Sequence, residues 1–181
     1  ERVNQKQART HAGVGIGDDG YSQQGLEDIA LMRSLPTMTV IQPADDLETE
    51  QAVLYLAAQH QGPAFLRTTR QNVERVNEGG YTFELGRMVT LKDGTAATLF
   101  ATGGTVAHAL HAARALEPAL SVRVVNVHTI KPIDEAAIIA HVKKLITPFK
   151  APSKVIQIPS LPKSGVGKIL RRELREMVPA S

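Results

Sequence analysis

Short apolar runs alternate with amphipathic stretches in the first half of the chain. Residues 38–43 (MTVIQP) and 63–69 (PAFLRTT) are apolar and bounded by proline, which predicts strands. Residues 26–35 (LEDIALMRSL) and 44–59 repeat apolar positions at helical spacing, and the second stretch begins with acids, as the helix dipole favours. This alternation predicts a parallel sheet with crossover helices.

The second half repeats the same pattern after a break. Residues 77–87 (NEGGYTFELGR) contain adjacent glycines and polar flanks, which indicate a linker and the start of a second unit. A strand, a helix and a second strand are predicted next, and the first strand has the composition of a buried one. They are residues 96–104 (AATLFATGG), residues 105–117 with Thr105 near the N-cap, and residues 121–128 (SVRVVNVH).

The end of the chain has a different texture. Residues 134–146 predict another amphipathic helix, with Asp134 and Glu135 in its first turn. From Pro148 onward, prolines separate short apolar pieces before a basic helical stretch. The predicted fold class is α/β: parallel-sheet units with crossover helices, two partial domains and a short α/β tail.

Residues 15–20 (GIGDDG) have the G-x-G-x-x-G spacing of a dinucleotide-binding turn. Asp18 and Asp19 would repel the phosphates that such a turn binds. The preceding residues 1–10 are among the most polar in the chain, and they do not predict the buried strand that this motif follows. The sequence therefore favours another use for this loop.

Composition narrows the function classes. The 181 residues, 43% of them apolar, suffice for one ordinary domain or two small ones. Without cysteine there is no disulfide framework, and without a long apolar run or a signal peptide we expect a cytoplasmic protein with no membrane partner. Aromatic residues make up only 4%, so nucleic-acid binding is not expected. Glu1 in place of an initiator Met is typical of a piece of a longer chain.

Two long stretches carry a family resemblance. Residues 10–45 (THAGVGIGDDGYSQQGLEDIALMRSLPTMTVIQPAD), followed by TRQN at residues 69–72, resemble the second half of the pyrimidine-binding domain of transketolases, especially the split C-terminal-subunit form. Residues 86–138 resemble the first part of the transketolase C-terminal domain. The resemblance implies a partial thiamine-diphosphate pyrimidine-binding domain at residues 1–76 and a partial C-terminal domain at residues 77–138.

The resemblance also implies an activity and a set of substrate-binding residues. Transketolases move ketol units between sugar phosphates on thiamine diphosphate with Mg²⁺. His11 would lie near the phosphate end of the sugar, Asp19 would bind a sugar hydroxyl and Arg70 would hold the phosphate. The alternative is that His11 and Asp19 satisfy turn amides and that Arg70 is a surface charge.

Three features depart from the family pattern or lie beyond this chain. Gln23 stands where the family usually has a histidine, and glutamine cannot titrate, so activity should be reduced or redirected. The family carries an apolar strand before Thr10, and residues 4–9 (NQKQAR) do not predict one. Most of the cofactor site lies outside the chain, which implies an N-terminal subunit or domain as partner, within a dimer.

Metal sites are not expected. Asp45, Asp46 and Glu48 are read as the acidic start of a helix rather than as metal ligands. His108 and His111 share a helix at i, i+3, but no third ligand is evident.

The tail resembles a different family. Residues 147–174 are similar to the C-terminal end of AMP-forming acyl-CoA synthetases, in which a glycine turn presents a lysine to the acyl-adenylate, and Lys168 occupies that place. This resemblance implies a third segment, residues 139–181. The favoured function is the C-terminal portion of a transketolase-like transferase that is inactive without its N-terminal part. An acyl-CoA synthetase C-terminal module, or an inactive fusion of the two, stays as an alternative, so whether the chain alone is an enzyme stays open.

Overall fold

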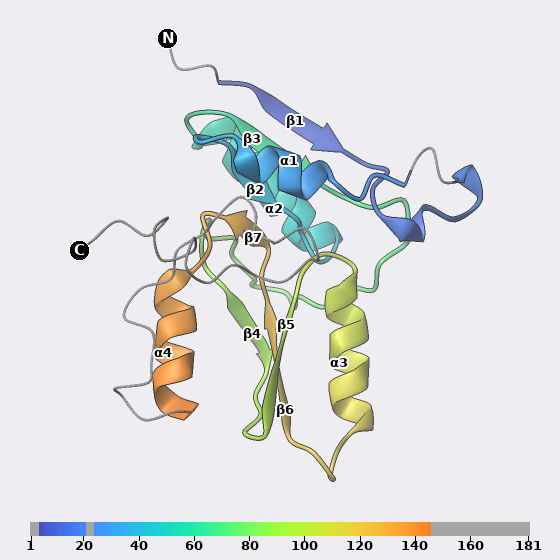
Figure 1. Cartoon of the computed structure of the whole chain (residues 1–181), viewed down its shortest axis with the longest axis vertical. Helices are drawn as coiled ribbons and strands as arrows, with labels where there is room; N and C mark the ends of the chain where they lie inside the picture. The colour runs from blue at the N-terminus through green and yellow to red at the C-terminus, as the bar shows by residue number, and fades with distance from the viewer. Residues whose placement is uncertain (1–3, 21–23, 146–181) are drawn as a thin grey trace, which may run out of the picture. The chain divides into compact units, whose positions relative to one another are not determined.

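A computed structural model of the chain describes residues 4–20 and 24–145 (Figure 1). The chain divides into two units, Glu1–Asp134 and Glu135–Ser181. The first unit contains both β-sheets. The described part of the second unit is helix α4 (Glu135–Leu145), which confirms the helix predicted for residues 134–146.

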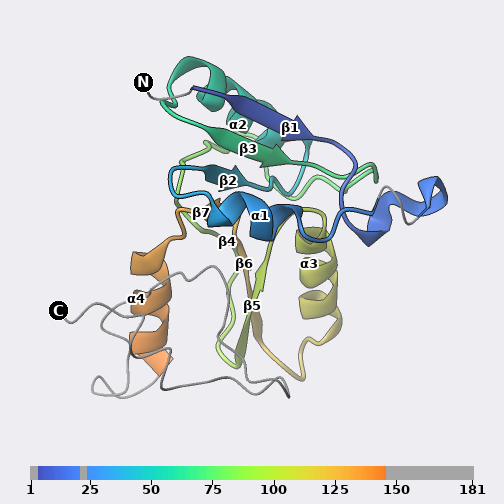
Figure 2. The ribbon, with the colours of Figure 1, turned by 45° about the horizontal axis from the view of Figure 1, so that its top comes forward.

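The first sheet is mixed, with three parallel strands and one antiparallel strand. In order across the sheet, its strands are β1 (Lys6–Arg9), β3 (Ala64–Arg67), β2 (Thr39–Ile41) and β7 (Thr129–Lys131). Strands β2 and β3 are buried along their whole length because helices α1 (Asp28–Ser34) and α2 (Asp46–Ala58) cover opposite faces (Figure 2). Two-sided burial is typical of central parallel strands.

Side chains that alternate along β2 and β3 build a separate core on each face of this sheet. Val40 and Phe65 pack on the α1 side, where Met32 also lies. Ile41 and Leu66 pack on the other side, where α2 contributes Ala52 and Leu56. The period-two pattern of a strand thus places neighbouring apolar residues in different cores.

The polar N-terminal residues form a strand, contrary to our expectation from the sequence. β1 pairs in parallel with β3, and backbone hydrogen bonds from Ala64 N to Gln5 O at 2.9 Å and from Thr68 N to Arg9 O at 2.7 Å flank the pairing. β1 lies at the edge of the sheet, and its side chains are exposed or half-buried. An edge strand is held by its backbone, so polar side chains do not prevent it.

The second sheet belongs to the other half of the first unit. In order, its strands are β4 (Val89–Lys92), β6 (Val122–Asn126) and β5 (Ala97–Ala101). β5 and β6 are parallel and are connected through helix α3 (Thr105–Ala115), whereas β4 is antiparallel to β6. The predicted strands and helix of this half are confirmed.

The prediction that β5 is buried is wrong. Leu99 is 37% exposed and Phe100 is 49% exposed. β5 lies at the edge of a three-stranded sheet, whereas β6 lies between two strands and is largely buried. An apolar run indicates a strand, but it does not say how many neighbours the strand has.

The two halves of the first unit share apolar and buried polar contacts. The apolar contact is made by Phe83, which lies in the segment predicted as a linker and belongs to the core on the α2 side of the first sheet. The fully buried carboxylate of Glu48 on α2 accepts hydrogen bonds from Asn126 Nδ2 at 2.9 and 3.1 Å and from the Tyr81 hydroxyl at 2.5 Å. β7, which follows β6, completes the first sheet by pairing with β2.

No helix within residues 4–20 and 24–145 is long and apolar enough to cross a bilayer.

Candidate functional site

The candidate substrate residues lie on loops that follow two neighbouring strands. β1 and β3 run in parallel, with Arg9 opposite Arg67. The chain continues from β1 into His11 and from β3 into Arg70. Ligands of open α/β sheets bind outside the carboxyl ends of the strands, which is where these two loops lie.

Asp19 and Arg70 form an ion pair. Asp19 ends a short 3₁₀ segment, η1 (Val14–Asp19), and its Oδ2 lies 3.2 Å from Arg70 Nη1. The same Nη1 donates to Ile16 O at 3.2 Å. The Arg70 and Asp19 side chains are 47% and 36% exposed, so solvent reaches both. The structure thus brings together two residues that lie far apart in the sequence.

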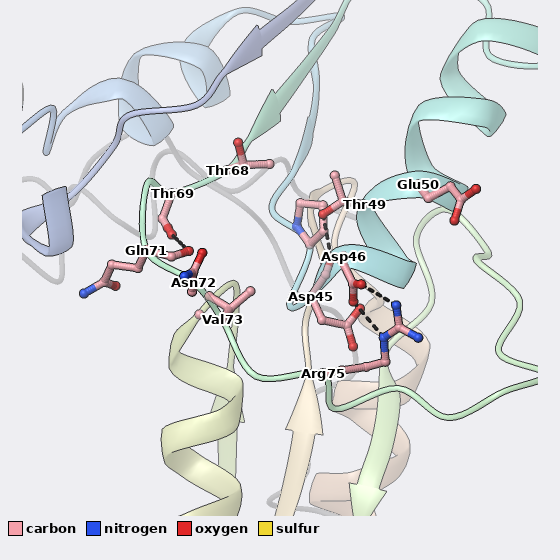
Figure 3. Close-up of a pocket in the computed structure, with 12 residues that line it drawn as sticks. Asp45, Asp46, Thr49, Glu50, Thr68, Thr69, Gln71, Asn72, Val73 and Arg75 are labelled. Carbon is pink, nitrogen blue, oxygen red and sulfur yellow. Dashed lines mark hydrogen bonds and ion pairs between the residues drawn. The ribbon is translucent and has the colours of Figure 1, made fainter.

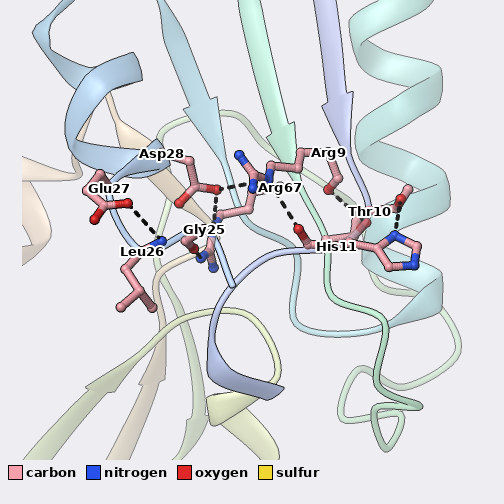
Figure 4. A network of polar contacts seen from close by, with 9 residues as sticks. Arg9, Thr10, His11, Gly25, Leu26, Glu27, Asp28 and Arg67 are labelled. Atoms are coloured by element: carbon pink, nitrogen blue, oxygen red, sulfur yellow. Dashed lines mark hydrogen bonds and ion pairs between the residues drawn. The ribbon is translucent and has the colours of Figure 1, made fainter. Parts of the chain in front are cut away.

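His11 is exposed and has local partners. Its Nδ1 lies 2.8 Å from Thr10 Oγ1, and its backbone carbonyl accepts a hydrogen bond from Arg9 Nε at 3.1 Å (Figure 4). Gln23, the fourth predicted substrate residue, and Lys168, the predicted adenylate-site lysine, lie outside the described residues.

A buried charged cluster beside these loops was not found from the sequence. Arg67 Nε donates to Asp28 Oδ2 at 2.8 Å, and both residues are buried (Figure 4). Arg9 Nε lies 3.9 Å from the same oxygen. Two signals were available: Asp28 begins an apolar helical stretch, and Arg67 ends the apolar strand AFLR, where an unpaired charge would be costly.

A separate pocket of about 680 Å³ opens beside the N-terminus of α2 (Figure 3). Its walls come from the loop after β2, the start of α2, the segment after β3 and Gly104 at the start of α3. Thr69 and Gln71 line it, although Arg70 between them does not. The Gln71 amide also lies against Gly15, where a Cβ would be 2.4 Å from it. The pocket is therefore adjacent to the Asp19–Arg70 pair rather than part of it.

Asp45, Asp46 and Glu48 form the acidic start of α2, as the sequence predicts. Asp45 is the N-cap and accepts a hydrogen bond from Glu48 N at 2.9 Å. Asp46 is exposed and pairs with Arg75, which holds the pKa of the Asp46 carboxyl at about 2. Burial raises the pKa of Glu48, although its hydrogen bonds oppose that shift. Within the described part of the chain, no three His, Asp or Glu side chains gather closely enough to hold a metal ion.

Comparison with known families decides the ancestry. The family model described as "Transketolase, pyrimidine binding domain" matches residues 2–75, and "Transketolase, C-terminal domain" matches residues 86–148.

The chain carries two transketolase-family domains.

Individual relatives agree with the two domains. The chain is 43% identical over 140 residues to a putative transketolase C-terminal section from Methanocaldococcus jannaschii, with 76% of this chain and 44% of the relative aligned. A solved split-gene transketolase, described as an inactive β4 tetramer, is 38% identical with a TM-score of 0.70, over 78% of this chain and 45% of that chain. A Pichia stipitis transketolase in complex with sedoheptulose-7-phosphate is 31% identical with a TM-score of 0.59, over 67% of this chain and 18% of that one.

The transketolase-family chain thus corresponds to a C-terminal portion, and it spans less than half the length of each of these relatives. Transketolases generally depend on thiamine diphosphate. Phe83 belongs to the core on the α2 side of the first sheet and Tyr81 packs against it, whereas Phe65 belongs to the core on the α1 side.

Proposed function

We propose that this chain is the C-terminal portion of a transferase that moves ketol units between sugar phosphates, and that it binds the phosphorylated sugar. The meeting of Asp19 and Arg70 at the carboxyl ends of adjacent parallel strands carries the proposal. Family resemblance assigns one of these residues to a sugar hydroxyl and the other to the phosphate. The relative that was solved with sedoheptulose-7-phosphate supports this substrate class.

Arg70 has the chemistry for a phosphate ligand. A guanidinium carries five N–H donors in a rigid plane, and Nη1 is engaged by Asp19 and Ile16. We expect the other N–H groups of Arg70 to bind the phosphate while these contacts hold the guanidinium plane in place. Asp19 contacts Arg70 through Oδ2, and we expect its Oδ1 to accept a hydrogen bond from a sugar hydroxyl.

His11 and Gln23 complete the proposed substrate set. His11 is exposed and adds an N–H donor at the phosphate end of the sugar. Gln23 donates and accepts hydrogen bonds but does not transfer protons near neutral pH. We therefore expect slower transfer, or a different preferred sugar, than in relatives that have a histidine at this position.

The activity requires a partner. Thiamine diphosphate with Mg²⁺ stabilises the carbanion that ketol transfer needs, and an N-terminal transketolase subunit or domain provides most of its site. The working form is a dimer in the cytoplasm. We propose residues 1–76 as a partial pyrimidine-binding domain, residues 77–138 as a partial C-terminal domain and residues 139–181 as a separate tail.

Reconstitution tests the proposal. The chain is mixed with the N-terminal subunit of a split transketolase, thiamine diphosphate and Mg²⁺, and ketol transfer from a ketose phosphate to an aldose phosphate is measured. Because Arg70 binds the phosphate, Arg70→Ala should raise KM for the phosphorylated donor by about 10- to 100-fold, the loss of one or two charge-assisted hydrogen bonds. The same variant should treat a ketose without a phosphate as the parent does.

Arg87→Ala is the matched control, since Arg87 is an exposed arginine whose partner, Glu84 at 3.4 Å, lies within the same turn. It should leave both KM values unchanged. Absence of ketol transfer at any ratio of chain to partner contradicts the proposed function. Equal effects of Arg70→Ala on the two donors contradict the phosphate role of Arg70.

A further inference from the structure

Two arginines converge on one carboxylate at the base of the loop that carries His11 and Asp19 (Figure 4). Arg67 Nε donates to Asp28 Oδ2 at 2.8 Å, and Arg9 Nε lies 3.9 Å from that oxygen. Asp28 is 5% and Arg67 8% exposed, whereas the Arg9 side chain is 40% exposed. Removing either member of a buried ion pair leaves an uncompensated charge, so the geometry of Asp28 and Arg67 is strongly maintained.

Both arginines sit at the last residue of a strand. Arg9 ends β1, Arg67 ends β3, and the two are opposite each other in the parallel register. His11 follows Arg9 by two residues, and Arg70 follows Arg67 by three. The cluster therefore marks the point where the rigid sheet passes into both candidate substrate loops.

The same side chains fasten the two ends of the first loop. Arg67 Nη2 donates to Gly25 O at 3.3 Å, and Gly13 N donates to that carbonyl at 3.0 Å. At the other end, Arg9 Nε donates to His11 O at 3.1 Å. Gly25 also lies against the Arg9 guanidinium, because a Cβ at this position would be only 2.2 Å from Arg9 Nη2.

The loop between these points carries Asp19 toward Arg70. Ile16 is 2% exposed and anchors the middle of the loop, and its carbonyl accepts from Arg70 Nη1. The position of Asp19 relative to Arg70 thus depends on how firmly the base of the loop is held.

We propose that Asp28, Arg67 and Arg9 form a clamp of positioning residues that fixes the loop bearing His11 and Asp19 against Arg70 before substrate binds. This inference rests on the proposed function. The clamp does not touch the sugar. It orders the loop before binding, so less conformational entropy is lost when the sugar binds, and binding is tighter.

The test uses Arg67→Lys. Lysine keeps the positive charge beside Asp28, but a single ammonium cannot reproduce the planar fork that bonds Asp28 and Gly25 together. Hydrogen exchange of the chain alone should become about tenfold faster for peptide amides in residues 11–20, because the loop opens locally more often, and it should be unchanged in α2. In the complex with the N-terminal subunit, KM for the ketose phosphate should rise about tenfold while kcat changes less than about threefold.

Arg87→Lys is the control and should change neither measurement. Arg9→Lys is the second variant, since it leaves the buried Asp28–Arg67 pair intact, and it should give a smaller change in the same direction. Unchanged exchange in residues 11–20 in both clamp variants overturns the clamp, whatever the activity. Faster exchange with an unchanged KM in an active complex overturns the positioning role. If the parent complex transfers no ketol, the proposed function fails, while the exchange result still decides the clamp.

Discussion

His128 is a buried titratable residue that the proposed site does not use. It is fully buried, its Nδ1 lies 2.9 Å from Thr129 Oγ1, and its ring centroid lies 4.7 Å from that of Phe83. Burial lowers the pKa of His128 to about 4. The residue therefore stays neutral in the folded chain at pH values where an unfolded histidine is already charged.

This pKa predicts an acid-sensitive stability. His128 contributes fully above pH about 6.5, its unfolded pKa, and the contribution is lost as the pH falls to about 4 and below. The gap between the two pKa values corresponds to about 3 kcal/mol. In His128→Asn, which does not titrate, the free energy of unfolding should fall less between pH 7 and pH 4 than it does in the parent. Denaturant titrations at several pH values measure this.

His111→Asn is the matched control, because His111 is half exposed and pairs with Glu74 at the surface. It should keep the acid sensitivity of the parent. An equal fall with pH in His128→Asn and in the parent would show that another group causes the acid sensitivity.

At the scale of single elements, the start of α2 depends on one side chain. Asp45 is 1% exposed; its Oδ1 accepts from Glu48 N, and its Oδ2 accepts from Val76 N at 2.9 Å and Asn77 N at 2.8 Å. This carboxylate both caps the helix and holds the segment that leads into the second half of the first unit.

Asp45→Ala should therefore lower the free energy of unfolding by about 2–4 kcal/mol, the combined effect of a lost N-cap and of buried amides without an acceptor. Asp46→Ala removes the neighbouring carboxylate, which is exposed and pairs with Arg75 at the surface, so it should leave the unfolding midpoint almost unchanged. Chemical denaturation compares the two variants. Equal losses would mean that acidity at the helix start matters more than the cap geometry.

The elements differ in how well the sequence predicts them. β2, β3, β6 and the long helices are predicted because burial imposes a pattern on their side chains. β1, β4 and β7 are missed because they lie at the edges of their sheets, where backbone bonds suffice and burial imposes little pattern on the side chains. The closeness of Asp19 and Arg70 agrees with a family resemblance, whereas the Asp28–Arg67 pair depends on a tertiary contact that local patterns do not contain.

At the scale of the whole molecule, the first unit combines the segment that matches the pyrimidine-binding domain with residues 86–134 of the segment that matches the C-terminal domain. Glu48 on α2 and Asn126 at the end of β6 are fully buried and bonded to each other, and Phe83 from the intervening segment completes the first core. Unfolding of either half would break these contacts.

We therefore expect the two halves of this unit to unfold together. Hydrogen exchange in rising denaturant should expose β3 and β6 in a single transition, because their opening free energies are shared. Asn126→Ala should lower the stability of both strands equally, by about 1–3 kcal/mol, since it leaves the buried Glu48 carboxylate with fewer donors. Thr90→Ala, at an exposed position of the edge strand β4, is the control and should change neither by more than about 0.5 kcal/mol. Separate transitions for β3 and β6 would contradict this coupling.

The path of β7 limits how these domains can be exchanged between relatives. Residues 129–131 come from the segment that matches the C-terminal domain, yet they pair with β2 of the pyrimidine-binding domain. In a chimera joined anywhere between residues 75 and 86, β2 would come from one parent and the edge strand β7 that pairs with it would come from the other. If β7 does not pair well with the β2 of the other parent, backbone N–H and C=O groups of β2 are left without hydrogen-bond partners. An unpaired strand edge of this kind promotes aggregation. Exchange of the pyrimidine-binding domain should therefore include residues 129–131 from the same parent.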